Sequence, residues 1–417
     1  MVDPRILPAL AVERPDRWAC VGRWFLGLGA VVFLAAIPVK LTFQNVGFIA
    51  MVVGAVLVRA RLWRHPGFGL ACAFAAWQVL SAVVSPYPDP IHRWGMAYNW
   101  VAFYLCATAF TETRFARWGM RLLVVTCVLV LALAVIQFTV GLDRAAKPWR
   151  VAAAGESFDH AVGLHHTHLT LGFQVVLAGL ILWYAAAAIR LGRVWQLCGV
   201  VATAGAAVVA QCRSAYVGLG AAVVAAQASR GWRRLLVGSA ALVVLGAVAL
   251  LAMHLTNPGK LEQLRNLEDG RMRIWPVSLD IAVDHPVFGV GGPEAFKQLY
   301  KERHAVAYPG EPPEFAHGAA HAHNSFISIA AEHGLPALAL YLAWIGAILL
   351  WLWRRRDASP EAWSLGLAAV GFAFAAGMFE NYAGDSEAAY ALHAALGLAV
   401  ALAATGQREG TGTSVAA

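Results

Sequence analysis

The chain has 417 residues, of which 59% are hydrophobic and 13% are charged, with a net charge of +8. Soluble domains usually carry about 25% charged residues, and many windows here reach the roughly 20 apolar residues that cross a bilayer. The composition therefore excludes an ordinary soluble protein and indicates an all-α polytopic membrane protein, in which basic residues mainly set topology rather than bind nucleic acid.

Twelve apolar segments are predicted to cross the membrane, within a single integral membrane domain that covers residues 1–417. No compact apolar stretch begins the chain, so no cleaved signal peptide is expected. The centres of the predicted spans are Leu26, Val52, Ala75, Phe103, Leu129, Leu177, Ala202, Val223, Leu245, Leu340, Val370 and Leu396.

The links between these spans alternate in charge. Arginines gather in every second link, from Arg14 and Arg17 near the start to the run 354–356 near the end. The positive-inside rule makes these links cytoplasmic. Both termini are then expected in the cytoplasm, and the other links face the opposite side.

Two of the extra-cytoplasmic links are long: 141–167 and 255–322. The second is large enough for a small subdomain. In it, Ile274, Val277 and Ile281 have helical spacing, which predicts an amphipathic helix on the membrane or the bundle. Pro276 predicts that this helix starts near Trp275 or is kinked there. The stretch "HPVFGVGGP" that follows is typical of a helix end and a turn.

Basic residues also lie on the extra-cytoplasmic side, against the topology rule. Arg213 occupies the short link "AQCRSAYVG" and either snorkels to lipid headgroups or binds an anion; both interpretations stay open. Arg271 and Arg273 are two residues apart, so on a helix they point in different directions.

A third basic cluster consists of Arg144, Lys147 and Arg150, for which attraction to lipid headgroups is the favoured interpretation. Several arginines at one membrane face suit a diphosphate, because the planar guanidinium binds phosphate oxygens in pairs. No Walker A pattern is present, so nothing indicates a nucleotide.

The stretch "HAHNSF" opens the tenth predicted span with His321, His323 and Asn324. Imidazole can remove a proton from an alcohol near neutral pH, so His323 is a candidate general base. Alternatively, Asn324 or Ser325 caps the helix and His323 is a bystander. The residues alone leave both interpretations open.

Further along the same span, small residues would form a seam for helix packing: Ala330, Gly334 and Ala337. On a continuous helix, Gly334 would lie about 20° from the face of His323. Glu332 would lie on the opposite face and is a functional candidate because it is ionisable; Pro336 offers a local kink as the alternative.

A metal site is the competing use of the histidines. The two groups 165–168 and 317–323 contain six of them, but neither an HExxH nor a DxD pattern occurs. We therefore expect no metal and no cofactor. His165, His166 and His168 could equally contact substrate or belong to a polar loop.

These motifs resemble the superfamily of O-antigen ligases, O-antigen polymerases and protein O-oligosaccharyltransferases. His323 and Asn324, followed by Gly334 and Ala337, resemble its late motif, in which Ala337 replaces a glycine. The block "GRMRIWPVSLDIAVDHPVFGVGG" resembles its GRxxxW…hPxxGvG pattern, and "CRSAYVG" resembles its short SRxxW link.

The resemblance implies a fold like that of C-type glycosyltransferases: about 12 transmembrane helices, with residues 255–322 as one large periplasmic loop packed over the active site. It implies a multi-pass protein of the bacterial inner membrane with a periplasmic active site. The implied activity is an inverting, metal-independent glycosyl transfer from undecaprenyl diphosphate.

Roles follow from the resemblance residue by residue. His323 matches the general base, and Arg213 and Arg271 match the arginines at the diphosphate. Arg273 has no such match, and Asn324 matches a motif position with a structural or orienting role. Apart from the resemblance, possible substrate contacts are Arg273, His321, Asn324, Arg144, Lys147 and Arg150.

Within the superfamily, the compact chain and single dominant late loop favour an O-antigen ligase, which takes part in lipopolysaccharide biosynthesis. Its partners would be an undecaprenyl-diphosphate-linked O-antigen donor, a lipid A–core oligosaccharide acceptor and membrane lipids. The alternatives are an O-antigen polymerase, or a transporter or flippase of lipid-linked sugars. No inverted repeat is visible, and this disfavours the transporter.

Overall fold

The computed structural model of the protein describes most of the chain. The described residues are 17–87, 98–140, 142–143, 150–151, 161–165, 167–256, 271–310 and 321–412.

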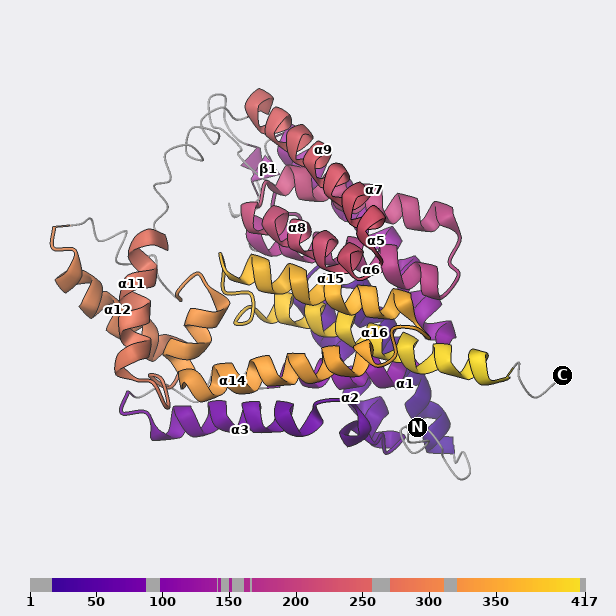
Figure 1. The fold of residues 1–417 in the computed structure, drawn as a ribbon, viewed down its shortest axis with the longest axis horizontal. Helices are drawn as coiled ribbons and strands as arrows, with labels where there is room; N and C mark the ends of the chain where they lie inside the picture. Colours follow the sequence, from indigo (N-terminus) through magenta and orange to yellow (C-terminus); the bar gives the residue numbers. More distant parts are fainter. Residues whose placement is uncertain are drawn as a thin grey trace.

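The described residues form a bundle of helices (Figure 1), joined by a 3-10 turn (Leu62–Arg64) and one short hairpin. In the hairpin, β1 (Leu142–Asp143) pairs antiparallel with β2 (Arg150–Val151). The bundle helices are α1 (Arg17–Ala35), α2 (Leu41–Leu57), α3 (Phe68–Val84), α4 (Val101–Ala109), α5 (Thr113–Val140), α6 (His168–Ala188), α7 (Arg193–Ala210), α8 (Arg213–Ala228), α9 (Trp232–Thr256), α14 (Ser325–Trp353), α15 (Pro360–Gly377) and α16 (Ser386–Gly412).

Every predicted span centre lies within one of these bundle helices. Among the described residues, six helices are long and apolar enough to cross a membrane: α1, α5, α6, α7, α14 and α16. The apolar helices α2 and α3 are shorter, and α4 has only 9 residues. A multi-pass helical protein is thus supported, while the number of twelve crossings stays a prediction.

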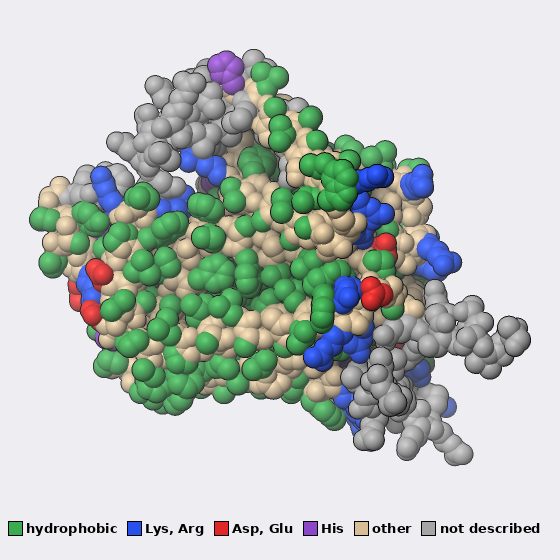
Figure 2. Space-filling model, in the orientation of Figure 1, with side chains coloured by type: hydrophobic (Ala, Val, Ile, Leu, Met, Phe, Trp, Pro, Cys, Tyr) green, Lys and Arg blue, Asp and Glu red, His purple; other side chains and the backbone are tan. Residues whose placement is uncertain are grey.

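The outer surface of the bundle is strongly apolar. Figure 2 shows hydrophobic side chains over most of the visible side of the bundle, with many of the Lys and Arg side chains gathered towards the end where α16 ends. Large side chains such as Val56 and Ile49 are 69% and 62% exposed. Such a surface is stable in lipid rather than in water.

Glycines allow the first two helices to pack backbone against backbone. A Cβ on Gly47 of α2 would lie 2.6 Å from the backbone nitrogen of Phe33, and one on Gly29 of α1 would lie 2.7 Å from that of Met51. Small residues at such contacts let membrane helices approach closely.

Two further helices lie beyond the end of the bundle where α14 begins (Figure 1): α11 (Arg271–Asp284) and α12 (Pro293–Ala307). The predicted amphipathic helix is confirmed, because Val277 and Ile281 of α11 are buried. Its predicted start near Trp275 is wrong. The helix begins at Arg271 and contains Pro276, which is tolerated because little more than one turn precedes it.

Helix α14 is broken at Gly334, whose backbone has φ 86° and ψ 168°. The prediction of one continuous face from His323 to Gly334 is therefore wrong. Near the break, the carbonyls of Ala331 and Glu332 accept hydrogen bonds of 2.9 and 2.8 Å from N–H groups of segment 286–291. This segment, which follows α11, thus replaces hydrogen bonds that the break removes.

Candidate functional site

The segment 378–385 connects α15 to α16 at the end of the bundle where α14 begins (Figure 1). It contains the stretch "FENYAGD", residues 379–385, with the acidic residues Glu380 and Asp385. Its residues contact each of the three residues predicted for catalysis or diphosphate binding, or their immediate neighbours.

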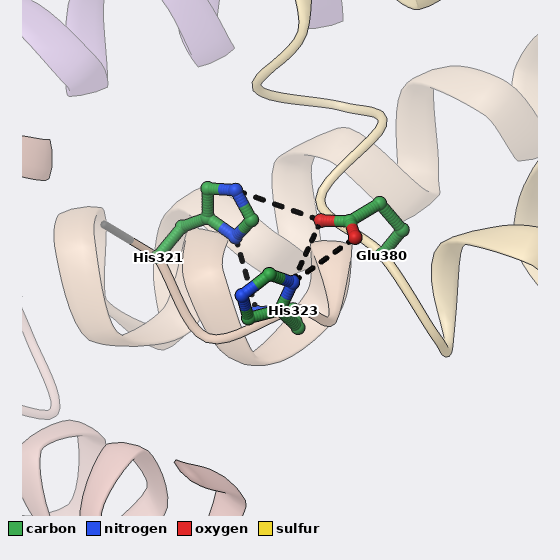
Figure 3. A group of neighbouring side chains, drawn as sticks. All are labelled: His321, His323 and Glu380. Atoms are coloured by element: carbon green, nitrogen blue, oxygen red, sulfur yellow. Dashed lines mark hydrogen bonds and ion pairs between the residues drawn. The ribbon is translucent and has the colours of Figure 1, made fainter. Parts of the chain in front are cut away.

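Glu380 of this segment contacts both histidines that precede α14 (Figure 3). The Nδ1 atom of His323 lies 3.0 and 3.1 Å from the two carboxylate oxygens, and Nε2 of His321 lies 3.5 Å from Oε1. A carboxylate can only accept, so the hydrogen bond places the imidazole proton of neutral His323 on Nδ1. Nε2 of His323 is then the unprotonated atom that can act as a base.

The backbone at His323 has a positive φ of 46°, which side chains other than glycine seldom adopt. Such strain is worth about 1–3 kcal/mol and gathers at functional sites. It is stabilised locally by a 3.2 Å hydrogen bond from the His323 N–H to Nδ1 of His321.

Asn324 fixes the start of α14. Its Oδ1 accepts from the N–H groups of Phe326 and Ile327 at 2.9 and 3.1 Å, while its Nδ2 donates to the carbonyl of Met378 at 3.1 Å. The expected helix cap is thus present. Because it also binds segment 378–385, the cap holds the neighbouring His323 against Glu380.

The charges in this cluster depend on one another. Burial opposes ionisation of Glu380, but the hydrogen bond and charge of His323, the charge of His321 and the N–H of Asn381 together lower the pKa of this carboxyl. Burial lowers the pKa of His321 to about 4, against the attraction of Glu380. At neutral pH the cluster therefore contains an ionised carboxylate beside a neutral His321.

Arg271 is placed next to Glu380. Its Nε donates to the carbonyl of Phe379 at 2.8 Å. The adjoining Arg273 is exposed, whereas Arg271 is half-buried, so the prediction that the two point in different directions is confirmed.

Arg213 is the first residue of α8. The hydroxyl of Ser214, the next residue, lies 2.7 Å from that of Tyr382. Because Tyr382 is two residues after Glu380, this contact ties the start of α8 to the same segment. The predicted substrate contacts of Arg144, Lys147 and Arg150 stay predictions. Arg144 and Lys147 lie outside the described residues, and only the backbone of Arg150 is described.

Among the described residues of the first long link, His165 pairs with another acidic residue instead of Glu380. His165 is buried and its Nδ1 lies 2.7 Å from Glu387 at the start of α16, so it acts in the packing of the bundle. His168 begins α6. His166 and His317 lie outside the described residues.

Glu332 is buried within the bundle, 3% exposed. With His333, Asn99 and His393 it lines an internal cavity of about 60 Å³. In the part of the chain that the structure describes, Oδ1 of Asn99 and Nδ1 of His393 have no hydrogen-bond partner. The cavity has space for a few water molecules, which would satisfy these atoms.

The cluster of His321, His323 and Glu380 offers one ligand atom from each residue, and these atoms lie within 4.8 Å of one another. It therefore combines a hydrogen-bonded base with a set of groups able to hold a cation. Sequence reasoning identified both histidines but missed Glu380, for which the only signal was an acidic residue directly after an apolar span.

The fold and the site together indicate a multi-pass helical membrane protein with a cluster of histidines and a carboxylate at the end of the bundle where α14 begins. Residues 198–342 match the model of the O-antigen ligase family. This match supports a member of the O-antigen ligase/O-antigen polymerase superfamily and, in general terms, a transferase activity. The matched residues include Arg213, Arg271 and His323, but not Glu380. No curated protein matches the chain.

Proposed function

We propose that this protein is an O-antigen ligase that transfers a glycan from undecaprenyl diphosphate to a hydroxyl group of lipid A–core oligosaccharide. The observation that carries this proposal is the hydrogen-bonded pair of His323 and Glu380, 3.0 Å apart, beside the anchored Arg271. A base next to permanent cations suits transfer of a group away from a diphosphate.

In the proposed reaction, Nε2 of His323 removes the proton of the acceptor hydroxyl while its oxygen attacks the anomeric carbon. The bond between that carbon and the diphosphate oxygen breaks, and its electron pair leaves with undecaprenyl diphosphate. Attack opposite the leaving group inverts the anomeric centre. Glu380 stabilises the imidazolium that forms, so it is a positioning residue.

Arg213 and Arg271 are proposed to stabilise the negative charge that grows on the departing diphosphate. Guanidinium groups remain charged at any relevant pH and bind phosphate oxygens in pairs. Such electrostatic stabilisation is strongest when the cations are held in place before the reaction. The hydrogen bond from Nε of Arg271 to Phe379 holds one of these cations, and the contact between Tyr382 and Ser214 fixes the start of α8, where Arg213 lies.

The proposed location is the bacterial inner membrane, with the site in the periplasm and both termini in the cytoplasm. The site lies at the start of α14, and the arginine run 354–356 follows the other end of that helix. The positive-inside rule makes the latter end cytoplasmic.

An O-antigen polymerase would use the same chemistry on a different acceptor. Gel analysis of lipopolysaccharide from a deletion strain distinguishes the ligase from the polymerase. Loss of a ligase leaves long lipid-linked polymer that never reaches the core, whereas loss of a polymerase leaves a single repeat attached to the core.

His323→Ala tests the base directly in purified protein with defined donor and acceptor. Transfer should be lost while donor binding survives. His254→Ala, at the exposed end of α9, is the matched control and should keep full activity. Near-normal transfer by His323→Ala would refute the assignment.

A further inference from the structure

We propose that His321, His323 and Glu380 form a binding site for a divalent transition-metal ion of the Zn²⁺ type, and that the bound ion inhibits transfer. The binding site follows from the positions of the three side chains. The inhibition rests on the proposed function, because it requires His323 to be the base.

The ligand atoms have separations close to those of a tetrahedral zinc site. Zinc bonds of about 2.0–2.2 Å to nitrogen and oxygen place neighbouring ligand atoms about 3.3–3.6 Å apart. Here a single carboxylate oxygen, Oε1 of Glu380, lies 3.1 Å from Nδ1 of His323 and 3.5 Å from Nε2 of His321, and the three ligand atoms lie within 4.8 Å of one another. Small side-chain shifts would therefore admit the ion.

Two imidazoles and one carboxylate are a ligand set that holds zinc with one position open. The side chains of His321 and His323 are 31% and 26% exposed, whereas that of Glu380 is 8% exposed. The cluster is thus open on one side, which gives the ion an entry path and a place for a water ligand. The N–H of Asn381 orients the carboxylate through a 2.9 Å hydrogen bond, as outer partners do in metal sites.

Binding would alter the present hydrogen bonds. Coordination through Nε2 of His321 places the ring proton on Nδ1, which now accepts the His323 N–H at 3.2 Å. That bond would be lost, and so would the one between His323 and Glu380. The ion therefore competes with the arrangement that makes His323 a base, and this is why it should inhibit.

No other trio of His, Cys, Asp or Glu groups with this spacing occurs among the residues that the structure describes. The donor types also predict selectivity. Imidazole with carboxylate suits Co²⁺, Zn²⁺ and Cu²⁺, with Zn²⁺ above Co²⁺ in affinity, whereas Mg²⁺ prefers oxygen ligands alone.

The binding experiment uses the purified full-length protein in detergent. Co²⁺ is titrated while its visible absorption is recorded, followed by displacement with Zn²⁺, and calorimetry gives the stoichiometry. We expect one ion per chain, a four-coordinate Co²⁺ spectrum and no response to Mg²⁺. His321→Gln and Glu380→Gln should each weaken Zn²⁺ affinity at least tenfold, whereas His254→Gln should not.

Thermal unfolding of each variant checks that it is folded. If Glu380→Gln does not fold, the Zn²⁺ affinities of His321→Gln and His321→Asn test the site instead. Absence of one-to-one Zn²⁺ binding by the unmodified protein overturns the proposal. So does unchanged affinity in the folded His321 variants.

The second arm measures transfer with Zn²⁺ and then with excess chelator. Loss of transfer that the chelator reverses supports inhibition, whereas binding without loss of transfer overturns it. A protein that binds Zn²⁺ but never transfers a glycan would refute the proposed function and leave the metal site standing. A protein that transfers the glycan but binds no Zn²⁺ would refute the metal site and leave the proposed function standing.

Discussion

Glu380→Gln tests whether the carboxylate acts through its charge. Glutamine has nearly the same size and keeps an oxygen that can accept from Nδ1 of His323 and from the N–H of Asn381. What it removes is the negative charge that stabilises the imidazolium in the transition state. The substitution thus separates charge from shape.

The size of the effect follows from the bond types. A hydrogen bond to a charged group contributes about 1.5–3 kcal/mol, against about 0.5–1.5 kcal/mol for a neutral one. Because the Glu380 side chain is only 8% exposed, water screens this difference little. The loss of roughly 1–2 kcal/mol predicts that kcat falls about 5- to 30-fold.

The assay is steady-state transfer by purified protein across a range of donor concentrations. KM for the donor should stay close to its original value, because the carboxylate is assigned to His323 and not to the diphosphate. Glu361→Gln is the control: this carboxylate, 35% exposed, pairs with Arg230 at 3.7 Å in the first turn of α15. An unchanged kcat in Glu380→Gln, or an equal loss in Glu361→Gln, would refute the reasoning.

Three other substitutions have defined outcomes. Gly334→Ala should abolish recovery of folded protein from membranes, because its φ is 86° and a Cβ would clash with the carbonyl of Val287, whereas Gly346→Ala in open space should be recovered normally. Tyr382→Phe removes the 2.7 Å hydrogen bond to α8, so KM for the donor should rise about fivefold, as expected for a loss of about 1 kcal/mol; an unchanged KM would argue against this anchor. Burial, and then the charge of Glu387, raise the pKa of Asp385 above its ordinary 3.8. The folded state therefore holds the Asp385 proton more tightly than the unfolded chain does. This contribution of Asp385 to the free energy of unfolding is complete below pH 3.8 and is lost as the pH rises through the raised pKa of the folded state. In Asp385→Asn, thermal melting should lose this pH dependence, and an unaltered dependence would assign it to another group.

The sequence was sufficient for features that depend on local pattern. Apolar composition located a helix at every predicted span, and the spacing of Val277 and Ile281 predicted the buried face of α11. Both follow from the short-range periodicity of a helix.

Features that depend on contacts between distant segments could not be predicted. Glu380 lies 57 residues after His323 in another link, and nothing in either stretch identifies the other as a partner. Likewise His165 could not be assigned, because its partner Glu387 is 222 residues away. The packing of the helices decides both contacts.

The break in α14 shows how two separate sequence blocks become one structural device. Gly334 and Pro336 weaken the helix, but on their own they would leave buried carbonyls without donors. The block "HPVFGVGG" supplies those donors from segment 286–291, and Gly289 within it has φ 60° where a Cβ would clash with the backbone of Glu332. The loop that follows α11 thus holds the short first part of α14, which directly follows His323 and the cap residue Asn324. Because α11 also carries Arg271, the same loop fixes the proposed base and one of the proposed diphosphate ligands relative to each other.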